Sequence, residues 1–157
     1  MRFKIVSLIA VAGLVAACGT APTSETATTS GQGAASGIVA GSAEDLKVNV
    51  GDRVFFAFDK YNLTAAARYT LQQQAAWLKT NSAVNVTIEG HCDERGTREY
   101  NLALGERRAT AVSDYLTSQG IAANRISTIS YGKERPEDAA SNETAWAKNR
   151  RGVTVVK

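Results

Sequence analysis

The sequence predicts an α/β fold in which helices pack on a four-stranded sheet, as an α+β sandwich. Between residues 43 and 157, segments with the two-residue periodicity of strands alternate with segments of helical periodicity, in the order βαβαβαβ. Each of the first three strands is followed by a segment long enough to form a helical crossover, which parallel neighbours require. The pattern does not decide which strand pairs are parallel.

The first strand and the first helix are predicted from the segment that begins at residue 52. Residues 52–58, DRVFFAF, are aromatic and β-branched, as is typical of a strand. Thr64 is placed to cap a helix that begins at residue 65, AAARYTLQQQAAWLK. Helical spacing puts one apolar face on this helix, made of Leu71, Ala75 and Leu78.

A second strand and a long helix follow, separated by a loop rich in reactive side chains. Residues 83–90 alternate with Val84, Val86 and Ile88 on one side. The loop EGHCDERGT runs from Glu89 to Thr97. A helix is predicted from about Arg98 to Gln119, and Gly120 stands where a glycine C-cap is expected.

Two further strands, separated by a short helix, complete the predicted fold. Residues 125–132, RISTISYG, have strand character, and so do residues 152–157, GVTVVK. Between them, residues 141–150 predict a short helix with Ser141 as its cap.

The chain begins with features of an exported and lipidated protein. Residues 1–17 combine a basic start, MRFK, with an apolar run too short to span a bilayer comfortably, and predict a signal peptide. The run ends in LVAAC, which resembles a bacterial lipobox with Cys18 as the lipidated first mature residue. Residues 18–42 are small and polar, which predicts a flexible tether ahead of a domain at 43–157. By resemblance to such lipoproteins, Gly19 favours the outer membrane, with the domain facing the periplasm.

Charge and cysteine content argue against a nucleic-acid-binding protein and against a fold stabilised by disulfide bonds. The chain has 18 basic and 15 acidic residues, and removal of Arg2 and Lys4 with the signal peptide leaves 16 basic residues against 15. This near-neutral balance and the lack of a basic stripe argue against nucleic acid as a partner. With Cys18 lipidated, Cys92 has no partner for a disulfide. The fold must therefore rest on its hydrophobic core.

Helical phase distinguishes two adjacent arginines. At 100° per residue, Arg108 falls on the apolar stripe of the long helix, whereas Arg107 falls outside it. The stripe consists of Asn101, Leu104, Gly105, Arg108, Ala109, Val112, Tyr115 and Leu116.

An inward arginine needs a partner, because an unpaired buried charge is costly. Arg108 therefore forms an internal ion pair, extends its charge toward solvent, or receives a carboxylate ligand through its planar fork. Asp93, in the loop before the helix, either pairs with Arg108 or stands beside it as an acceptor for an ammonium group. An anion and a cation in one pocket fit a zwitterion, and the helix N-terminus near Thr97 favours a carboxylate.

The stretch TIEGHCDERGTREYNLALGERRATAVSDYL resembles the peptidoglycan-binding signature of OmpA-like domains. The resemblance rests on the loop G-H-x-D-x-x-G and the helix N-x-x-L-x-x-x-R-A-x-x-V, which here are Gly90, His91, Asp93, Gly96, Asn101, Leu104, Arg108, Ala109 and Val112. VFFAFDKYNL, ISYGKERP and KNRR extend it over about residues 50–157. The signal peptide, lipobox and tether agree with a lipoprotein branch of this family.

The resemblance implies an OmpA-like βαβαβαβ fold with a mixed sheet and a binding module without a cofactor. Its ligand would be the meso-diaminopimelate of the peptidoglycan stem peptide, with Asp93 on the ammonium and Arg108 on the carboxylate. Phe58 and Asp59 would give backbone donors and a wall. The rest of the pocket would be shaped by Thr97, Asn101 and Leu104.

The resemblance also implies a partner and one departure from the family pattern. Proteins of the Tol system, notably TolB, would bind the domain; the alternative is a wall-anchoring lipoprotein of the same family without Tol partners. Many family members have Ser at the position of Gly105, so the missing hydroxyl is expected to leave more room there.

A hydrolase that uses Cys92 or a metal ion is the rival class. A thiol nucleophile needs a base within reach, and His91 and Cys92 point to opposite sides if they continue the strand. One histidine and one free cysteine are also too few ligands for a usual zinc site. We therefore expect neither catalytic nor metal-binding residues.

Overall fold

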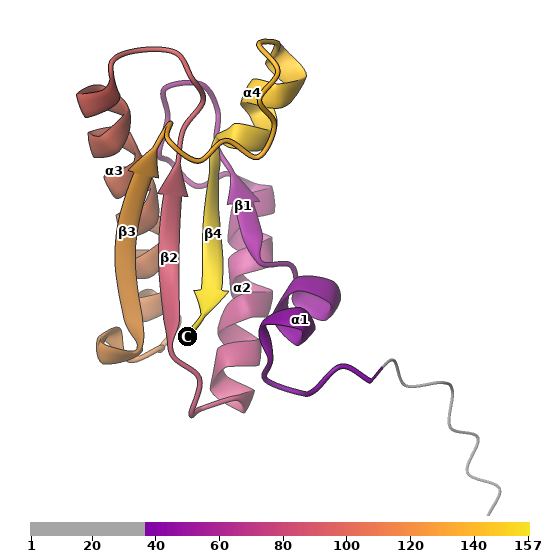
Figure 1. Ribbon diagram of the computed structural model, residues 1–157. Coiled ribbons are helices and arrows are strands. Elements are labelled where there is room, and N and C mark those ends of the chain that lie inside the picture. The colour runs from indigo at the N-terminus through magenta and orange to yellow at the C-terminus, as the bar shows by residue number, and fades with distance from the viewer. Residues whose placement is uncertain (1–36) are drawn as a thin grey trace, which may run out of the picture. The chain divides into compact units, whose positions relative to one another are not determined.

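The computed structural model describes residues 37–157 (Figure 1). The predicted signal peptide, Cys18 and most of the predicted tether lie outside the described residues. Within residues 37–157, no helix has both the length and the apolar character needed to cross a bilayer.

One four-stranded sheet forms the centre of the domain. Its order is β1-β4-β2-β3, with strands β1 Arg53–Phe55, β2 Val86–His91, β3 Ile126–Gly132 and β4 Arg151–Val156. β2 and β3 are parallel, whereas β4 runs antiparallel to both β1 and β2. The sheet is therefore mixed, and the last strand of the chain lies inside it, between β1 and β2.

Four helices accompany the sheet: α1 Ala43–Asp45, α2 Ala65–Thr80, α3 Arg98–Ser118 and α4 Glu143–Asn149. A π-helical turn, Leu46–Val50, continues α1, and a 3₁₀ turn, Ala123–Arg125, precedes β3. α2 and α3 lie on the same face of the sheet, and α4 lies at one end of it (Figure 1). This confirms the predicted fold class.

Most predicted helix ends are confirmed by their capping hydrogen bonds. The hydroxyl of Thr64 accepts from the N–H of Ala67, and that of Thr97 accepts from Tyr100. Gly120 has the left-handed φ of 91° expected just after α3.

Several predicted boundaries differ from the structure. β2 begins at Val86 instead of residue 83 and extends to His91, which was expected in the loop. The cap of α4 is Asn142 and not Ser141, because the Asn142 side chain accepts from the N–H of Ala145. β1 spans only Arg53–Phe55, since the chain turns into the loop at residues 57–60 earlier than the apolar run suggests.

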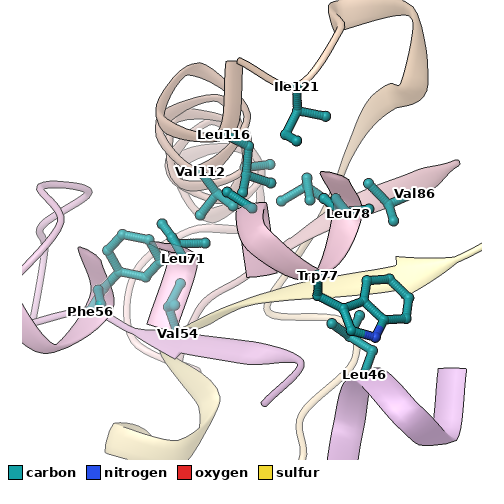
Figure 2. Packing of buried hydrophobic residues seen from close by; sticks show 14 residues of the cluster. Leu46, Val54, Phe56, Leu71, Trp77, Leu78, Val86, Val112, Leu116 and Ile121 are labelled. Atoms are coloured by element: carbon teal, nitrogen blue, oxygen red, sulfur yellow. The ribbon is translucent and has the colours of Figure 1, made fainter. Parts of the chain in front are cut away.

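The hydrophobic core lies between the sheet and the two long helices (Figure 2). Leu71 and Leu78 of α2 meet Val112 and Leu116 of α3 over the sheet. Trp77 lies at the edge of this core, where its indole N–H donates to Asp45 at 2.8 Å. The domain thus holds together through apolar packing, as expected for a chain whose described part has a single free cysteine.

Two glycines bring α3 unusually close to β2. A Cβ atom on Gly90 would lie 1.9 Å from the carbonyl oxygen of Gly105, and one on Gly105 would lie 2.2 Å from the Ser130 hydroxyl. The expectation that Gly105 leaves extra room is therefore wrong: the backbone of β2 and the side chain of Ser130 occupy that space.

The loops that carry the candidate site gather at one end of the sheet. Because β4 is antiparallel to β1 and β2, and β3 is parallel to β2, the first three strands end at the same edge (Figure 1). Residues 56–64, 92–97 and 133–142 therefore lie at this edge, together with α4 and the first turn of α3.

Candidate ligand-binding site

A cavity of about 200 Å³ opens between the loops after β1 and β2 and the first three turns of α3. It is lined by Phe58, Asp59, Cys92, Asp93, Arg95, Gly96, Tyr100, Asn101, Leu104 and Arg108. Six of the seven predicted ligand-binding residues are in this set. The seventh, Thr97, caps α3 and does not line the cavity.

Arg108 is fully buried beneath the cavity and is held by neutral groups. Its Nε donates to the carbonyl of Lys60 at 2.8 Å, one terminal nitrogen donates to that of His91 at 2.8 Å, and the other to that of Ala57 at 3.2 Å. A further contact of 3.3 Å joins it to Cys92 Sγ. The side chain is thus fixed by the loop after β1 and the end of β2.

The charge of Arg108 lacks a counterion in the described part of the chain. No ion pair among residues 37–157 includes Arg108, so neither the internal ion pair nor the solvent-directed charge is observed. Burial lowers the pKa of its guanidinium, although the neighbouring Cys92 and Asp93 oppose this shift. A ligand carboxylate would supply the missing negative charge.

Asp93 has other partners than Arg108. Its Oδ2 lies 2.5 Å from Arg95 and 3.3 Å from Arg150, and Oδ1 accepts from the backbone N–H of Arg95 at 3.2 Å. Burial opposes ionisation of Asp93, but hydrogen bonds from Arg95 and Arg150 outweigh it, and the pKa of the carboxyl lies below its ordinary value. Of the two predicted arrangements, the structure therefore has Asp93 beside Arg108 rather than paired with it.

The loop between Asp93 and α3 is fixed by local hydrogen bonds. Asn101 donates to the carbonyls of Arg95 at 2.8 Å and Thr97 at 3.1 Å. Gly96 adopts a φ of 89°, which few other residues tolerate. Asn101 thus shapes the cavity mainly by holding its wall in place.

The opposite wall is a tight turn after β1. The N–H of Lys60 donates to the carbonyl of Ala57 at 3.2 Å, and Asp59 within this turn has a φ of 57°. Asp is one of the few side chains that adopt this conformation readily. The Tyr100 hydroxyl donates to Asp59 and joins this turn to α3.

Arg95 is the main site residue that sequence reasoning missed. Its guanidinium lies between two aromatic rings, 3.9 Å from the centroid of Phe58 and 4.2 Å from that of Trp146. The spacing Asp93-x-Arg95 is compatible with an Asx turn, which could have indicated the pair. Nothing local indicates Trp146, which is 51 residues farther along the chain.

His91 and Cys92 do not form a nucleophile–base pair. The ring of His91 lies 3.4 Å from Glu89 and packs at a tilt against Tyr131, whereas the Cys92 thiol donates to the Asn101 carbonyl at 3.3 Å. Burial raises the pKa of Cys92 to about 11, which keeps it a thiol at neutral pH. Residues 37–157 hold no group of three or more side chains placed to bind a metal ion.

Comparison with known proteins identifies the class to which this fold and cavity belong. Residues 55–150 match the model of the OmpA family, which is more than half of the chain. The chain therefore belongs to the OmpA family and, within it, to the peptidoglycan-associated lipoproteins.

The second assignment rests on relatives and on one solved structure. The peptidoglycan-associated lipoprotein of Brucella melitensis is 55% identical over 116 residues, which are 74% of this chain and 69% of that protein. The one from Pasteurella multocida is 46% identical over 112 residues, 71% of this chain and 74% of that protein. The crystal structure of the Burkholderia pseudomallei protein of that name superposes with a TM-score of 0.66 at 40% identity, covering 68% of this chain and 90% of that one.

Proposed function

We propose that this protein is a non-catalytic outer-membrane lipoprotein that binds peptidoglycan non-covalently. It holds the diaminopimelate of the stem peptide and links the outer membrane to the cell wall, as part of the Tol–Pal system in envelope integrity and cell division. The names of its relatives support association with peptidoglycan and a lipid anchor.

The observation that carries this proposal is the buried guanidinium of Arg108, which has no counterion among residues 37–157 and lies beneath a cavity that Asp93 also lines. One end of meso-diaminopimelate carries an ammonium and a carboxylate on the same carbon. Arg108 receives the carboxylate, and Asp93 receives the ammonium. A zwitterion then supplies Arg108 with a counterion without adding net charge to a buried site.

The other cavity residues position this ligand. Phe58 and Asp59 form one wall and offer their backbone N–H groups, and Leu104 contacts the methylene chain of the ligand. Asn101 and Thr97 keep the opposite wall and the start of α3 in place. Because Arg108 is already fixed by three carbonyls, little side-chain entropy is lost on binding.

Membrane attachment and the Tol partner extend the proposal beyond the described residues. Cys18 carries the lipid anchor, and residues between Cys18 and the domain form the tether. TolB is the proposed periplasmic partner. A wall-anchoring lipoprotein of the same family without a Tol partner is the alternative, and a pull-down with TolB separates the two.

The site is tested by two substitutions and a matched control. Arg108→Lys keeps the positive charge but loses the planar guanidinium, and Asp93→Asn removes the negative charge. Each substitution is expected to weaken binding of a diaminopimelate stem peptide by about tenfold or more. Arg107→Lys makes the same change at the neighbouring exposed position and should leave affinity unchanged. Calorimetric titration and co-sedimentation with purified peptidoglycan measure both effects.

The ligand is varied in the same titrations. A stem peptide with lysine in place of diaminopimelate lacks the distal carboxylate and is expected to bind much more weakly to the unaltered protein. If both variants stay folded by circular dichroism and bind like the unaltered protein, the site assignment is wrong.

A further inference from the structure

We propose that the guanidinium of Arg95 occupies the ammonium subsite as an internal substitute for the ligand cation. A zwitterion can bind fully only when Arg95 leaves Asp93, so that Arg95 sets the selectivity of the site. This inference rests on the proposed function, because it assumes that Asp93 receives the ligand ammonium.

The contacts of Asp93 show which of its two arginines can be exchanged. Arg150 is only 8% exposed and also donates to the carbonyl of Phe56 at 3.1 Å and to Glu143 at 2.8 Å. Arg95 is 30% exposed and lines the cavity. Arg150 is therefore a fixed part of the framework, and Arg95 is the cation that can move.

The remaining contacts of Arg95 keep it at the carboxylate without locking it. The rings of Phe58 and Trp146 sandwich its guanidinium, and Glu143 lies 3.8 Å away. Its Nε has no hydrogen-bond partner among residues 37–157. Phe58 is 55% exposed, so the path of the guanidinium from Asp93 toward solvent runs past an open aromatic edge.

Four side chains form a closed ring of alternating charge around this position. Asp93 contacts Arg95, Arg95 contacts Glu143, Glu143 contacts Arg150, and Arg150 contacts Asp93. When an ammonium takes the place of the Arg95 guanidinium, the charge next to Asp93 stays the same. The exchange therefore keeps two cations at the buried carboxylate of Asp93, the ligand ammonium and the fixed Arg150.

This exchange predicts how the site separates ligands. A ligand with only a carboxylate neutralises Arg108 and leaves Arg95 where it is. A zwitterion gains the contact with Asp93 but loses the contact between Asp93 and Arg95. Removal of the Arg95 charge should therefore strengthen binding of the zwitterion and leave binding of the carboxylate-only ligand unchanged.

The experiment uses full-length protein in detergent and two synthetic peptides. One is a stem tripeptide with meso-diaminopimelate, and the other is identical except that hydrogen replaces the distal amine. Arg95→Met and Arg95→Gln both remove the positive charge of Arg95. The control, Arg98→Met, removes a positive charge from an exposed arginine outside the cavity. Both Arg95 variants should bind the first peptide about tenfold more tightly and the second within twofold of the unaltered protein. Arg98→Met should change neither.

Trp146 gives a readout that is independent of affinity. The diaminopimelate peptide should shift the Trp146 indole N–H resonance in the unaltered protein, because Arg95 leaves its ring; the amine-free peptide should not. In the Arg95 variants the shift should be largely lost. Trp77, in the core on α2, serves as the internal reference.

Weaker or unchanged binding of the zwitterion by folded Arg95 variants would overturn the inference while leaving the proposed function intact. If the Arg95 variants bind both peptides more tightly by the same factor, the inference is also overturned, since that result indicates a general effect of charge. If the unaltered protein binds neither peptide, the proposed function fails, and this inference fails with it.

Discussion

At the scale of single residues, His91 makes the stability of the domain sensitive to mild acid. It is the only histidine of the chain and is 2% exposed. Burial, with the positive charge of Arg151, lowers its pKa from 6.5 to about 4. Between these values the unfolded chain takes up a proton that the folded chain does not, so stability falls as the pH falls.

We expect the free energy of unfolding to decrease by about 2 kcal/mol between pH 7 and pH 5 because of this residue alone. Urea denaturation at both pH values measures the change. His91→Gln, which cannot take up a proton, should remove most of the pH dependence in this range. An equally steep loss in the variant would assign the effect to other groups.

The Asp93 carboxyl adds a second, more acidic step at this scale. Because its pKa is lowered in the folded state, its contribution to stability is complete above the ordinary aspartate pKa and is lost as the pH falls through the lowered value. The two residues therefore act in different ranges, and the interval from pH 7 to pH 5 reports on His91.

At the scale of elements, the contact of α3 with β2 is set by Gly90 and Gly105. A Cβ on Gly90 would meet backbone at 1.9 Å, so Gly90→Ala must push the helix away from the strand. We expect a loss of about 3 kcal/mol in the free energy of unfolding. Denaturant titration at pH 7 measures it, and a loss below about 1 kcal/mol would show that α3 can shift at little cost.

Gly105→Ala is expected to cost less, about 1 kcal/mol, for two reasons. Alanine favours a helix over glycine, and the nearest obstacle is the Ser130 hydroxyl, which can rotate away from the Leu102 carbonyl. Ser130→Ala removes this obstacle, so the cost of Gly105→Ala should shrink in that background. Unchanged cost in the double variant would instead place the strain at the Gly90 carbonyl.

Sequence periodicity predicted the elements well because it reports local physics. Helical phase placed Arg108 inside and Arg107 outside, and both positions are confirmed by their exposure. The order of the strands was not available from such a pattern, because the place of β4 between β1 and β2 depends on pairings between residues about 60 to 100 apart, such as Arg53 with Val153.

In the candidate site, too, local features were predictable from the sequence and long-range contacts were not. Its outline followed from the resemblance and from the phase of α3, which places Asn101, Leu104 and Arg108 on one stripe. The partners of Asp93 did not follow, because Arg150 approaches from the far end of the chain and Trp146 of α4 fixes the loop residue Arg95. Such contacts depend on tertiary structure, which a local pattern does not encode.

At the scale of the whole molecule, the proposal gives the protein two separate attachments. We expect replacement of residues 1–18 by a cleavable secretory leader without the cysteine to move the protein from the outer membrane to the soluble periplasm. Its retention on isolated peptidoglycan should not change, because the cavity lies entirely within residues 58–108. Cell fractionation and co-sedimentation measure these two properties.

A mass measurement of the N-terminal peptide supplies the control for this experiment. The unaltered protein should carry lipid on Cys18, and the version with the secretory leader should not. Continued membrane association of the lipid-free protein would contradict the proposed anchor.

The antiparallel pairing of β1 with β4 also determines how the domain responds to mechanical load. Under the proposed attachment, a pull between membrane and wall enters before α1 and leaves through the ligand held by Asp93 and Arg108. Arg108 is hydrogen-bonded to the loop after β1, so part of the load passes through that loop. The load is then directed along β1, whose register with β4 comprises three residue pairs, Arg53 with Val153, Val54 with Gly152 and Phe55 with Arg151. These pairs are loaded together in shear rather than opened one after another. The lifetime of the link under tension is therefore governed by the rate at which this short edge strand is pulled out.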